Sequence, residues 1–281
     1  MKRRTMIACG IIALLFVLLI GRLIYFSIFK NGIYKRQVLS QQNYSSETLP
    51  YKRGDILDRD GNTLATSQKM YTLVLEPKNI LRSEEVQKAT IDALHKYMKL
   101  DEDKLLKFIK RHKDSYYSVY REELSYSQIA DLKDFIASDK AENVSGIVFN
   151  EKYKRRYPNQ SLASQVIGFV SDGTIGTGGI EQYYNSTLSG VDGRKYKYLN
   201  EELEQDSSIV EPENGKTVVT TIDSNIQKLA EDQLSKFEKK YGSKGSSILV
   251  MNPNNGEIYA MANSTSYNLE SPRDDKNLLK K

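Results

Sequence analysis

The sequence is poor in the residues that build disulfide frameworks and metal centres. It has no tryptophan, two histidines and a single cysteine among 281 residues. One cysteine, Cys9, cannot form a disulfide within the chain or supply a cysteine-based metal site, so a folded domain must gain its stability from its core. His95 and His112 each lie in or beside a lysine-rich stretch without a second ligand at metal spacing. We therefore expect no metal and no cofactor.

Signatures of phosphate and nucleic-acid binding are also missing. The glycine-dense residues 173–179 match neither the Gly-Lys-Ser/Thr of a P-loop nor the pattern G-x-G-x-x-G. The net charge of +5 is spread along the chain, and no block of basic residues alternates with aromatics, so nucleic acid is not an expected partner. The lack of tryptophan and of an aromatic-rich pocket signature also argues against an anchored solute-binding module.

One long apolar segment is present near the N-terminus. Residues 6–29 carry a single charge, Arg22, and exceed the roughly 20 residues that a helix needs to cross a bilayer. Lys2, Arg3 and Arg4 precede this segment, which predicts a cytoplasmic N-terminus and an extracytoplasmic bulk. A cleaved signal peptide is the alternative, but the apolar run is long for one and no A-x-A-like site follows. We expect an uncleaved, single-pass anchor in the plasma (inner) membrane, with the lipid bilayer as a partner.

Residues 51–65, YKRGDILDRDGNTLA, predict a tight hairpin. Ile56 and Leu57 begin a strand, residues 58–62 form the turn, and residues 63–65 return. Arg53 and Arg59 alternate with acidic residues, so we expect their guanidinium groups near several carboxylates. Gly54 marks a place without room for a Cβ atom. The alternative is a solvated hairpin whose charges all face water.

The following residues alternate between helical and strand patterns, which is typical of an α+β fold. Further strands are expected at residues 71–75, 116–123, 146–150 and 215–221, and helices at residues 83–98, 101–110 and 125–136. Asp223 is expected to cap a helix over residues 224–240 whose inward residues are Ile226, Leu229, Ala230, Leu234 and Phe237. A hairpin is expected at residues 246–262, around Asn254-Asn255-Gly256. The acidic residues 201–213 are interpreted as a linker.

Two segments between residues 152 and 193 need separate interpretation. Residues 152–158, KYKRRYP, fit either an anion-binding patch or, more simply, an edge strand kept soluble by its lysines and arginines. The glycine-dense turn then leads into a helix expected to bury Ile180, Tyr183, Tyr184 and Leu188 before a glycine stop.

Four separated motifs resemble the N-terminal part of the class B penicillin-binding proteins, the peptidoglycan D,D-transpeptidase family. They are R-G-x-I-x-D-R-x-G-x-x-L-A in the first hairpin, an R-x-Y-P segment, a G-x-x-G-[IL]-E…Y…L-x-G-x-x-G segment, and T-T-I-D before the helix at residues 224–240. The resemblance also implies a strand after R-x-Y-P, at residues 166–170, VIGFV. The residues that carry the resemblance are Arg53, Gly54, Asp58, Arg59, Gly61, Arg156, Tyr157, Pro158, Gly179, Glu181, Gly190, Gly193 and Asp223.

The resemblance implies a domain plan and a set of partners. Residues 1–30 would be a cytoplasmic tip and transmembrane anchor, residues 31–213 an elongated α+β dimerisation or pedestal domain, and residues 214–281 the start of a transpeptidase domain. It also implies cross-linking of peptidoglycan stem peptides through an acyl-serine. Implied partners are peptidoglycan or its precursor, a membrane glycan polymerase, other envelope-synthesis proteins and a second copy in a homodimer.

The catalytic signature of that family does not assemble in this sequence. Its acyl transfer uses S-x-x-K, S-x-N and K-T-G, with the lysine within hydrogen-bond reach of the serine. The only S-x-x-K, Ser27–Lys30, lies at the expected membrane exit; Ser266-Tyr267-Asn268 has no nucleophile before it, and K-T-G is absent. We therefore expect no catalytic residue in these 281 residues and interpret the chain as a truncated form. The alternative is a non-catalytic envelope scaffold that binds a glycan polymerase or a division or elongation partner.

Overall fold

The structure, a computed structural model, describes residues 15–20, 22, 45–171, 174–199, 205–243 and 245–272. Residues 15–20 are helical, and among the described residues no helix has the length and apolar character needed to cross a membrane. The remainder of the predicted anchor lies outside the described residues. The chain divides into two compact units, one of Met1–Leu49 with Asp192–Pro212 and one of Pro50–Val191 with Glu213–Lys281.

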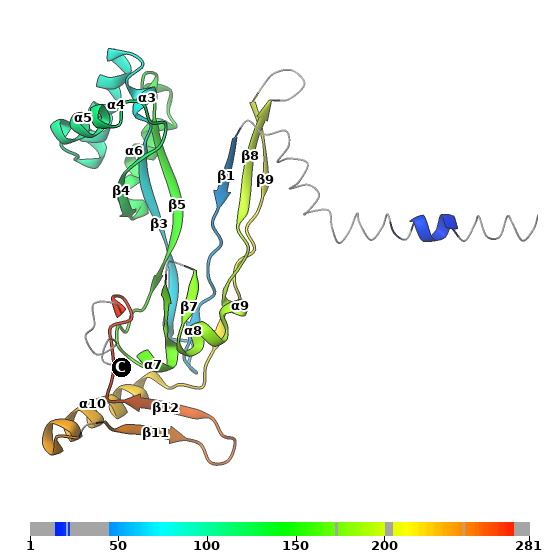
Figure 1. Cartoon of the computed structure of the whole chain (residues 1–281), viewed down its shortest axis with the longest axis vertical. Coiled ribbons are helices and arrows are strands. Elements are labelled where there is room, and N and C mark those ends of the chain that lie inside the picture. The colour runs from blue at the N-terminus through cyan, green and yellow to red at the C-terminus, as the bar shows by residue number, and fades with distance from the viewer. Residues whose placement is uncertain are drawn as a thin grey trace, which may run out of the picture. The chain divides into compact units, whose positions relative to one another are not determined.

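The smaller unit contains a three-stranded antiparallel sheet. Its strands are β1 (Ser45–Leu49), β8 (Gly193–Leu199) and β9 (Gln205–Val210), in the order β1-β8-β9 (Figure 1). The linker prediction for residues 201–213 is therefore wrong over β9. This strand pairs with β8 from Arg194↔Val210 to Leu199↔Gln205, and an acidic composition alone does not reveal that a basic partner strand is present.

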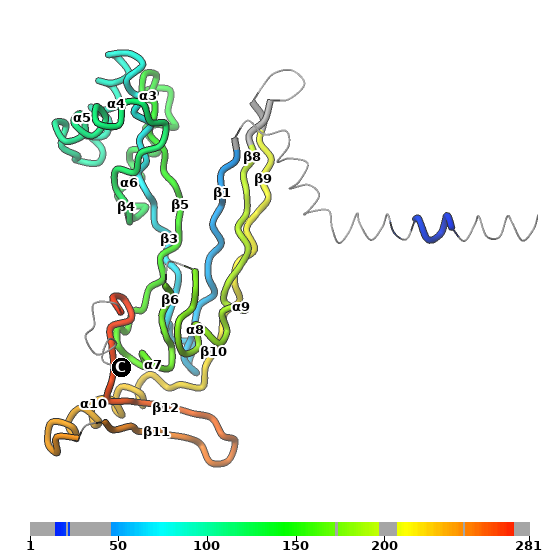
Figure 2. The backbone as a smooth tube through the Cα atoms, in the orientation of Figure 1, coloured from blue at the N-terminus to red at the C-terminus, as the bar shows by residue number. Residues whose placement is uncertain are grey.

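The larger unit is organised around one long strand, β3 (Thr63–Leu75). It pairs antiparallel with β2 (Ile56–Leu57), β4 (Ser118–Leu124) and β5 (Ile147–Arg156), and β10 (Val218–Val219) adds in parallel to β2. The first hairpin is thus confirmed. The sequence predicted two separate strands at residues 63–65 and 71–75, but β5 pairs continuously from Thr66 to Leu75 and joins them into one (Figure 2).

Helices cover the C-terminal half of β3 and form the first core. They are α3 (Pro77–Ile80), α4 (Glu84–Met98), α5 (Glu102–Arg111) and α6 (Tyr126–Ile136), with a 3₁₀ turn at Asp139–Ala141. The N-termini of α4, α5 and α6 lie where the sequence predicts, because Ser83, Asp101 and Ser125 cap them. The fully buried members of this core are Leu73, Leu75, Ile80, Leu94, Leu105, Ile109, Ile129 and Leu132.

The N-terminal half of β3 lies in a second core with short elements from the glycine-dense region. These are α7 (Ser164–Ile167), β6 (Phe169–Ser171), β7 (Ile175–Thr177), α8 (Gly179–Tyr183) and α9 (Asn185–Leu188). The predicted strand at residues 166–170 is correct only from Phe169, because residues 166 and 167 end α7. The second core contains Ile56, Leu64, Ala65, Tyr157, Ala163, Ile167, Leu188, Tyr267 and Leu269.

The prediction that Tyr183 and Tyr184 are buried is wrong. Their side chains are 81% and 41% exposed, respectively. The helix breaks at Tyr184 into α8 and α9, so the two tyrosines do not follow the face that a continuous helix would bury. The buried residue of α8 is instead the charged Glu181.

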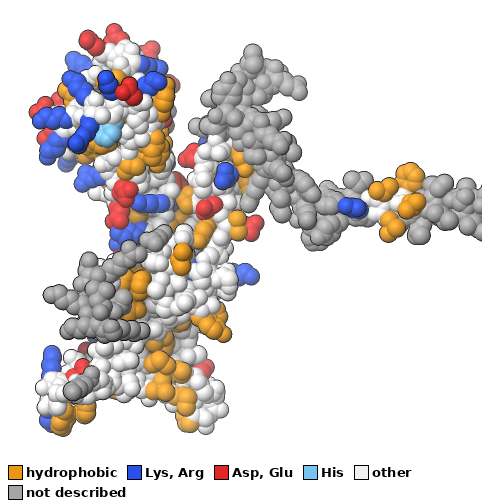
Figure 3. All heavy atoms as spheres, viewed as in Figure 1, with side chains coloured by type: hydrophobic (Ala, Val, Ile, Leu, Met, Phe, Trp, Pro, Cys, Tyr) orange, Lys and Arg blue, Asp and Glu red, His pale blue; other side chains and the backbone are white. Residues whose placement is uncertain are grey.

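A third core joins α10 (Ser224–Tyr241) to the hairpin of β11 (Ser247–Met251) and β12 (Ile258–Asn263). Asp223 caps α10 as predicted, because its Oδ1 accepts hydrogen bonds from the backbone N–H groups of residues 225 and 226. Ala230 and Leu234 face the hairpin, but Leu229 and Phe237 are exposed, contrary to prediction, since the hairpin covers only one face of α10. Figure 3 shows hydrophobic side chains at the surface in this region.

Candidate functional site

A buried ion pair connects the first hairpin to the glycine-dense segment. Glu181 is completely buried, and Arg53 is 3% exposed. Arg53 Nε donates to Glu181 Oε2 at 2.8 Å, and Nη2 lies 2.7 Å from the same oxygen. The guanidinium group also donates to the backbone oxygens of Glu181 and Thr174 and to Ser189 Oγ. One arginine thus fixes the positions of β7, α8 and the end of α9.

A second arginine binds the other oxygen of the same carboxylate. Arg155 Nε donates to Glu181 Oε1 at 2.7 Å, and Arg155 Nη1 donates to the backbone oxygen of Gly54 at 2.8 Å and to Ser67 Oγ at 3.2 Å. Tyr157 places its hydroxyl 3.4 Å from Glu181 Oε1. Burial, together with the neighbouring Glu181 carboxylate, raises the pKa of Tyr157 far above its ordinary value, so this hydroxyl stays protonated and donates. We call Arg53, Arg155, Tyr157 and Glu181 the Glu181 cluster.

The chemistry of the Glu181 cluster is that of a structural clamp. Its carboxylate is fully used by two guanidinium groups, and removing one partner from such a buried set leaves an uncompensated charge. Charge-assisted hydrogen bonds of this kind fix geometry more tightly than neutral ones. The cluster holds no nucleophile beside a base, so it does not support acyl or phosphoryl transfer.

Close backbone contacts surround the Glu181 cluster. A Cβ atom on Gly54 would lie 1.9 Å from the backbone oxygen of Lys216, so no other residue fits there without movement. Gly179 begins α8 at φ +51°, and a Cβ there would lie 2.2 Å from the backbone oxygen of Val166. Gly190 follows Ser189, the C-cap of α9, whereas Gly193 begins β8 and Gly61 lies in the turn of the first hairpin.

Asp58 connects the first hairpin to α10. Its side chain is fully buried; Oδ1 accepts from the backbone N–H groups of Asp60 and Asn62, and Oδ2 accepts from Asn62 Nδ2 and from Ser224 Oγ at 2.6 Å. Burial opposes ionisation of this carboxyl, but the hydrogen bonds from Ser224, Asn62 and Asp60 outweigh it and lower the pKa of Asp58 below its ordinary value.

The expectation that Arg53 and Arg59 lie against the carboxylates of their own hairpin is corrected by these contacts. Arg53 binds Glu181, 128 residues away. Arg59 is exposed, and its guanidinium carbon lies 4.4 Å from the ring centroid of Tyr259 in β12. The alternating acids of the hairpin bind elsewhere: Asp55, for example, accepts from Lys52 and Thr66.

The R-x-Y-P segment contributes a residue that the sequence analysis did not select. Arg156 is half-buried and donates to Glu270 and Gln68 at the surface, whereas Arg155 enters the Glu181 cluster. Counting back from Pro158, which is exposed at the following turn, the arginine of R-x-Y-P is Arg155. The edge-strand interpretation of residues 152–158 fits Lys152 and Lys154, which pair with Glu122 and Glu123, but not the buried Arg155.

Other candidate residues show no catalytic arrangement. Tyr267, within the S-x-N match, is buried in the second core and donates its hydroxyl to the backbone oxygen of Ser164, while Ser27 and Lys30 lie outside the described residues. His95 Nδ1 and His112 Nδ1 each contact a backbone oxygen. Among the described residues no group of three or more histidine, cysteine or acidic side chains could hold a metal ion.

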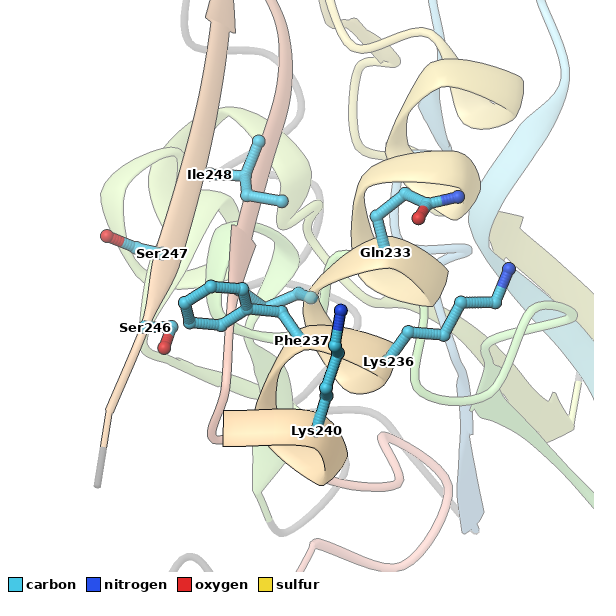
Figure 4. A pocket seen from close by; sticks show the side chains of 8 residues that line it. Gln233, Lys236, Phe237, Lys240, Ser246, Ser247 and Ile248 are labelled. Atoms are coloured by element: carbon cyan, nitrogen blue, oxygen red, sulfur yellow. The ribbon is translucent and has the colours of Figure 1, made fainter. Parts of the chain in front are cut away.

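An open cavity of about 480 Å³ lies between the C-terminal part of α10 and the start of β11. In Figure 4, Phe237 reaches from α10 towards β11 and Ile248 faces the helix, whereas Lys236 extends from the side of α10 away from β11. The lining residues include the apolar Leu234, Phe237 and Ile248 and the two lysines Lys236 and Lys240. The lining contains no acid–base pair and supports no reaction.

The sequence profile described as "Penicillin-binding Protein dimerisation domain" matches residues 48–220, more than half of the chain. The chain belongs to this family. All four residues of the Glu181 cluster lie inside the matched region. Together with the relatives described next, the match places the chain in the N-terminal region of the class B penicillin-binding proteins.

Curated relatives extend well beyond the length of this chain. Stage V sporulation protein D from Bacillus subtilis is 28% identical over 266 residues, covering 89% of this chain but 39% of the relative. The probable peptidoglycan D,D-transpeptidase PenA from Neisseria meningitidis is 28% identical over 267 residues, which cover 93% of this chain and 44% of PenA. The chain thus spans about two fifths of the length of these relatives.

Solved structures of penicillin-binding proteins share the fold. Penicillin Binding Protein 2X from Streptococcus thermophilus aligns with a TM-score of 0.67 and 25% identity, covering 83% of this chain and 37% of that one. A peptidoglycan synthetase from Bifidobacterium adolescentis aligns with a TM-score of 0.59 and 25% identity, covering 84% and 46%. The mixed α+β architecture of this chain is therefore the one expected from its sequence.

Proposed function

We propose that this chain is the membrane-proximal, non-catalytic part of a peptidoglycan D,D-transpeptidase. Several curated relatives carry that activity in their names, among them PenA of Neisseria meningitidis and FtsI of Escherichia coli. The observation that carries the proposal is the Glu181 cluster, because it joins segments more than 100 residues apart into one rigid support within the matched region. In this proposal the support holds a catalytic unit in place and performs no chemistry itself.

The proposal includes a single-pass membrane anchor at residues 6–29, with residues after 30 outside the cytoplasm. Its support is the sequence: a long apolar run preceded by Lys2, Arg3 and Arg4. Contacts with a membrane glycan polymerase, with other envelope-synthesis proteins and with a second copy belong to the same proposal. The domain division at residues 30 and 213 stays a prediction.

Labelling in the native cell tests the proposal. An antibody against residues 45–272 is used to capture the native protein from membranes treated with fluorescent penicillin. We expect a captured band that carries the label and that loses it after pre-incubation with unlabelled penicillin. A captured protein with the mass of this chain alone that never carries label contradicts the transpeptidase proposal and supports a non-catalytic scaffold.

A further inference from the structure

Two residues in the turn after β5 adopt a backbone conformation that their side chains disfavour. Gln160 has φ +50° and Ala163 has φ +52°. This left-handed region is adopted readily by glycine and at a cost by residues with a Cβ atom. Such outliers persist only where surrounding contacts hold them. We call residues 157–168 the coupling loop.

The contacts that hold these two residues come from the C-terminal part of the chain. Gln160 accepts, through its backbone oxygen, a hydrogen bond from the backbone N–H of Leu269 at 3.1 Å. Ala163 donates its backbone N–H to Glu231 Oε1, on α10, at 2.8 Å. Each strained residue therefore presents a backbone group to a partner that lies more than 60 residues later in the sequence.

Residues 264–270, which we call the strap, bind the coupling loop along its length. Tyr267 is buried in the second core, where its N–H donates to Ser164 Oγ and its hydroxyl donates to the Ser164 backbone oxygen. Glu270 closes the far end: Oε1 accepts from the backbone N–H of Tyr157 at 2.7 Å, and Oε2 accepts from Arg156 at 3.1 Å.

The same short segment contacts the Glu181 cluster. Tyr157, which donates its backbone N–H to Glu270, directs its hydroxyl towards Glu181 Oε1. Arg155, two residues before it, is ion-paired with the same oxygen. Residues 155–157 thus contact both the strap and the Glu181 cluster. A displacement of the strap would therefore move Arg155 and Tyr157, which contact Glu181.

We propose that the strap is a conformational latch: while docked it holds Gln160 of the coupling loop in its strained form, and its release relaxes this part of the loop and loosens the Glu181 cluster. This inference concerns a movement within one unit and does not depend on the transpeptidase activity. The contiguous physical network is the strap, the coupling loop, residues 155–157 and Glu181.

Hydrogen–deuterium exchange on the full 281-residue chain tests the latch. Glu270→Ala removes the end contact of the strap, and Glu151→Ala, which removes an ion pair with Lys69 on the same unit, is the matched control. We expect Glu270→Ala to speed exchange about tenfold in peptides covering residues 157–168 and 174–190, with α4 and α5 unchanged, and Glu151→Ala to leave both peptides unchanged. Faster exchange confined to residues 264–272 overturns the proposal.

A second pair of variants tests the role of the strained backbone. Gln160→Gly relieves the left-handed strain at residue 160 and keeps the backbone oxygen that accepts from Leu269. The control is Lys99→Gly, which relieves the same kind of strain at φ +53° on the C-cap of α4, away from the strap. In the Glu270→Ala background we expect Gln160→Gly to reduce the exchange increase in residues 157–168, whereas Lys99→Gly leaves it unchanged. Equal responses to the two glycine substitutions contradict a strained latch.

Discussion

Arg53 and Glu181 are 128 residues apart in the sequence, yet Arg53 Nη2 lies 2.7 Å from Glu181 Oε2 in a site from which water is almost fully excluded. Arg155 binds the remaining carboxylate oxygen from β5. Three distant segments therefore share one carboxylate. Among their described partners, Arg53 and Arg155 have no buried carboxylate other than Glu181. The position of Glu181 therefore sets the positions of both guanidinium groups.

Gly54→Ala tests the close approach beside the clamp. The added Cβ atom would lie 1.9 Å from the backbone oxygen of Lys216, so the backbone of one segment must move. We expect a loss of about 1–3 kcal/mol in the free energy of unfolding, measured by urea denaturation. Gly245→Ala is the control, because its nearest neighbour would be Ser264 Oγ at 3.9 Å and its stability should not change. An equal effect of both substitutions would contradict this account.

Asp58→Asn tests the link between the first hairpin and α10. The folded state holds the pKa of Asp58 below its ordinary value, so the carboxylate stabilises the fold above about pH 4, and this contribution is lost as the pH falls through the folded pKa. We expect the wild type to lose stability between about pH 5 and pH 3 and Asp58→Asn to be less stable at pH 7 with a flatter profile.

The control for that profile is Asp60→Asn, two residues away in the same turn and exposed. Urea denaturation at pH 7 and at pH 3.5 gives the comparison. A profile of Asp58→Asn that keeps the full acid slope of the wild type would show that Asp58 does not carry the pH dependence.

Incubation of the purified chain with penicillin tests the absence of a reactive serine. The only S-x-x-K, Ser27–Lys30, lies at the expected membrane exit, and no K-T-G occurs in the sequence, so no other serine has the lysine partner that acylation needs. We expect intact-mass spectrometry to show no stable acyl adduct. An adduct on any serine would place a reactive group where the sequence indicates none.

Local signals predicted local structure well. The caps Ser83, Asp101 and Asp223 each bind N–H groups within three residues, so the sequence contains everything needed to recognise them. The turn at Asp58–Asn62 is equally local. Pattern and resemblance together also selected Arg53 and Glu181 as important positions.

Long-range pairing was the part that the sequence could not supply. Periodicity indicated a buried Tyr184, but the two arginines that select Glu181 for burial lie on β5 and before β2. Strand β9 was missed because its acidic residues were interpreted as a linker, and nothing in their composition indicates that they pair with β8. The sequence could have identified Arg155, since its spacing to Tyr157 and Pro158 matches R-x-Y-P.

The most direct test of the clamp is the free energy of unfolding of Glu181→Gln, which keeps the shape of the side chain and removes its charge. We expect a loss of about 3–5 kcal/mol, because two buried guanidinium groups then lack a counter-charge. Glu151→Gln, which breaks the surface pair with Lys69, should cost about 1 kcal/mol or less. If Glu181→Gln unfolds at the same urea concentration as Glu151→Gln, the clamp does not hold this fold together.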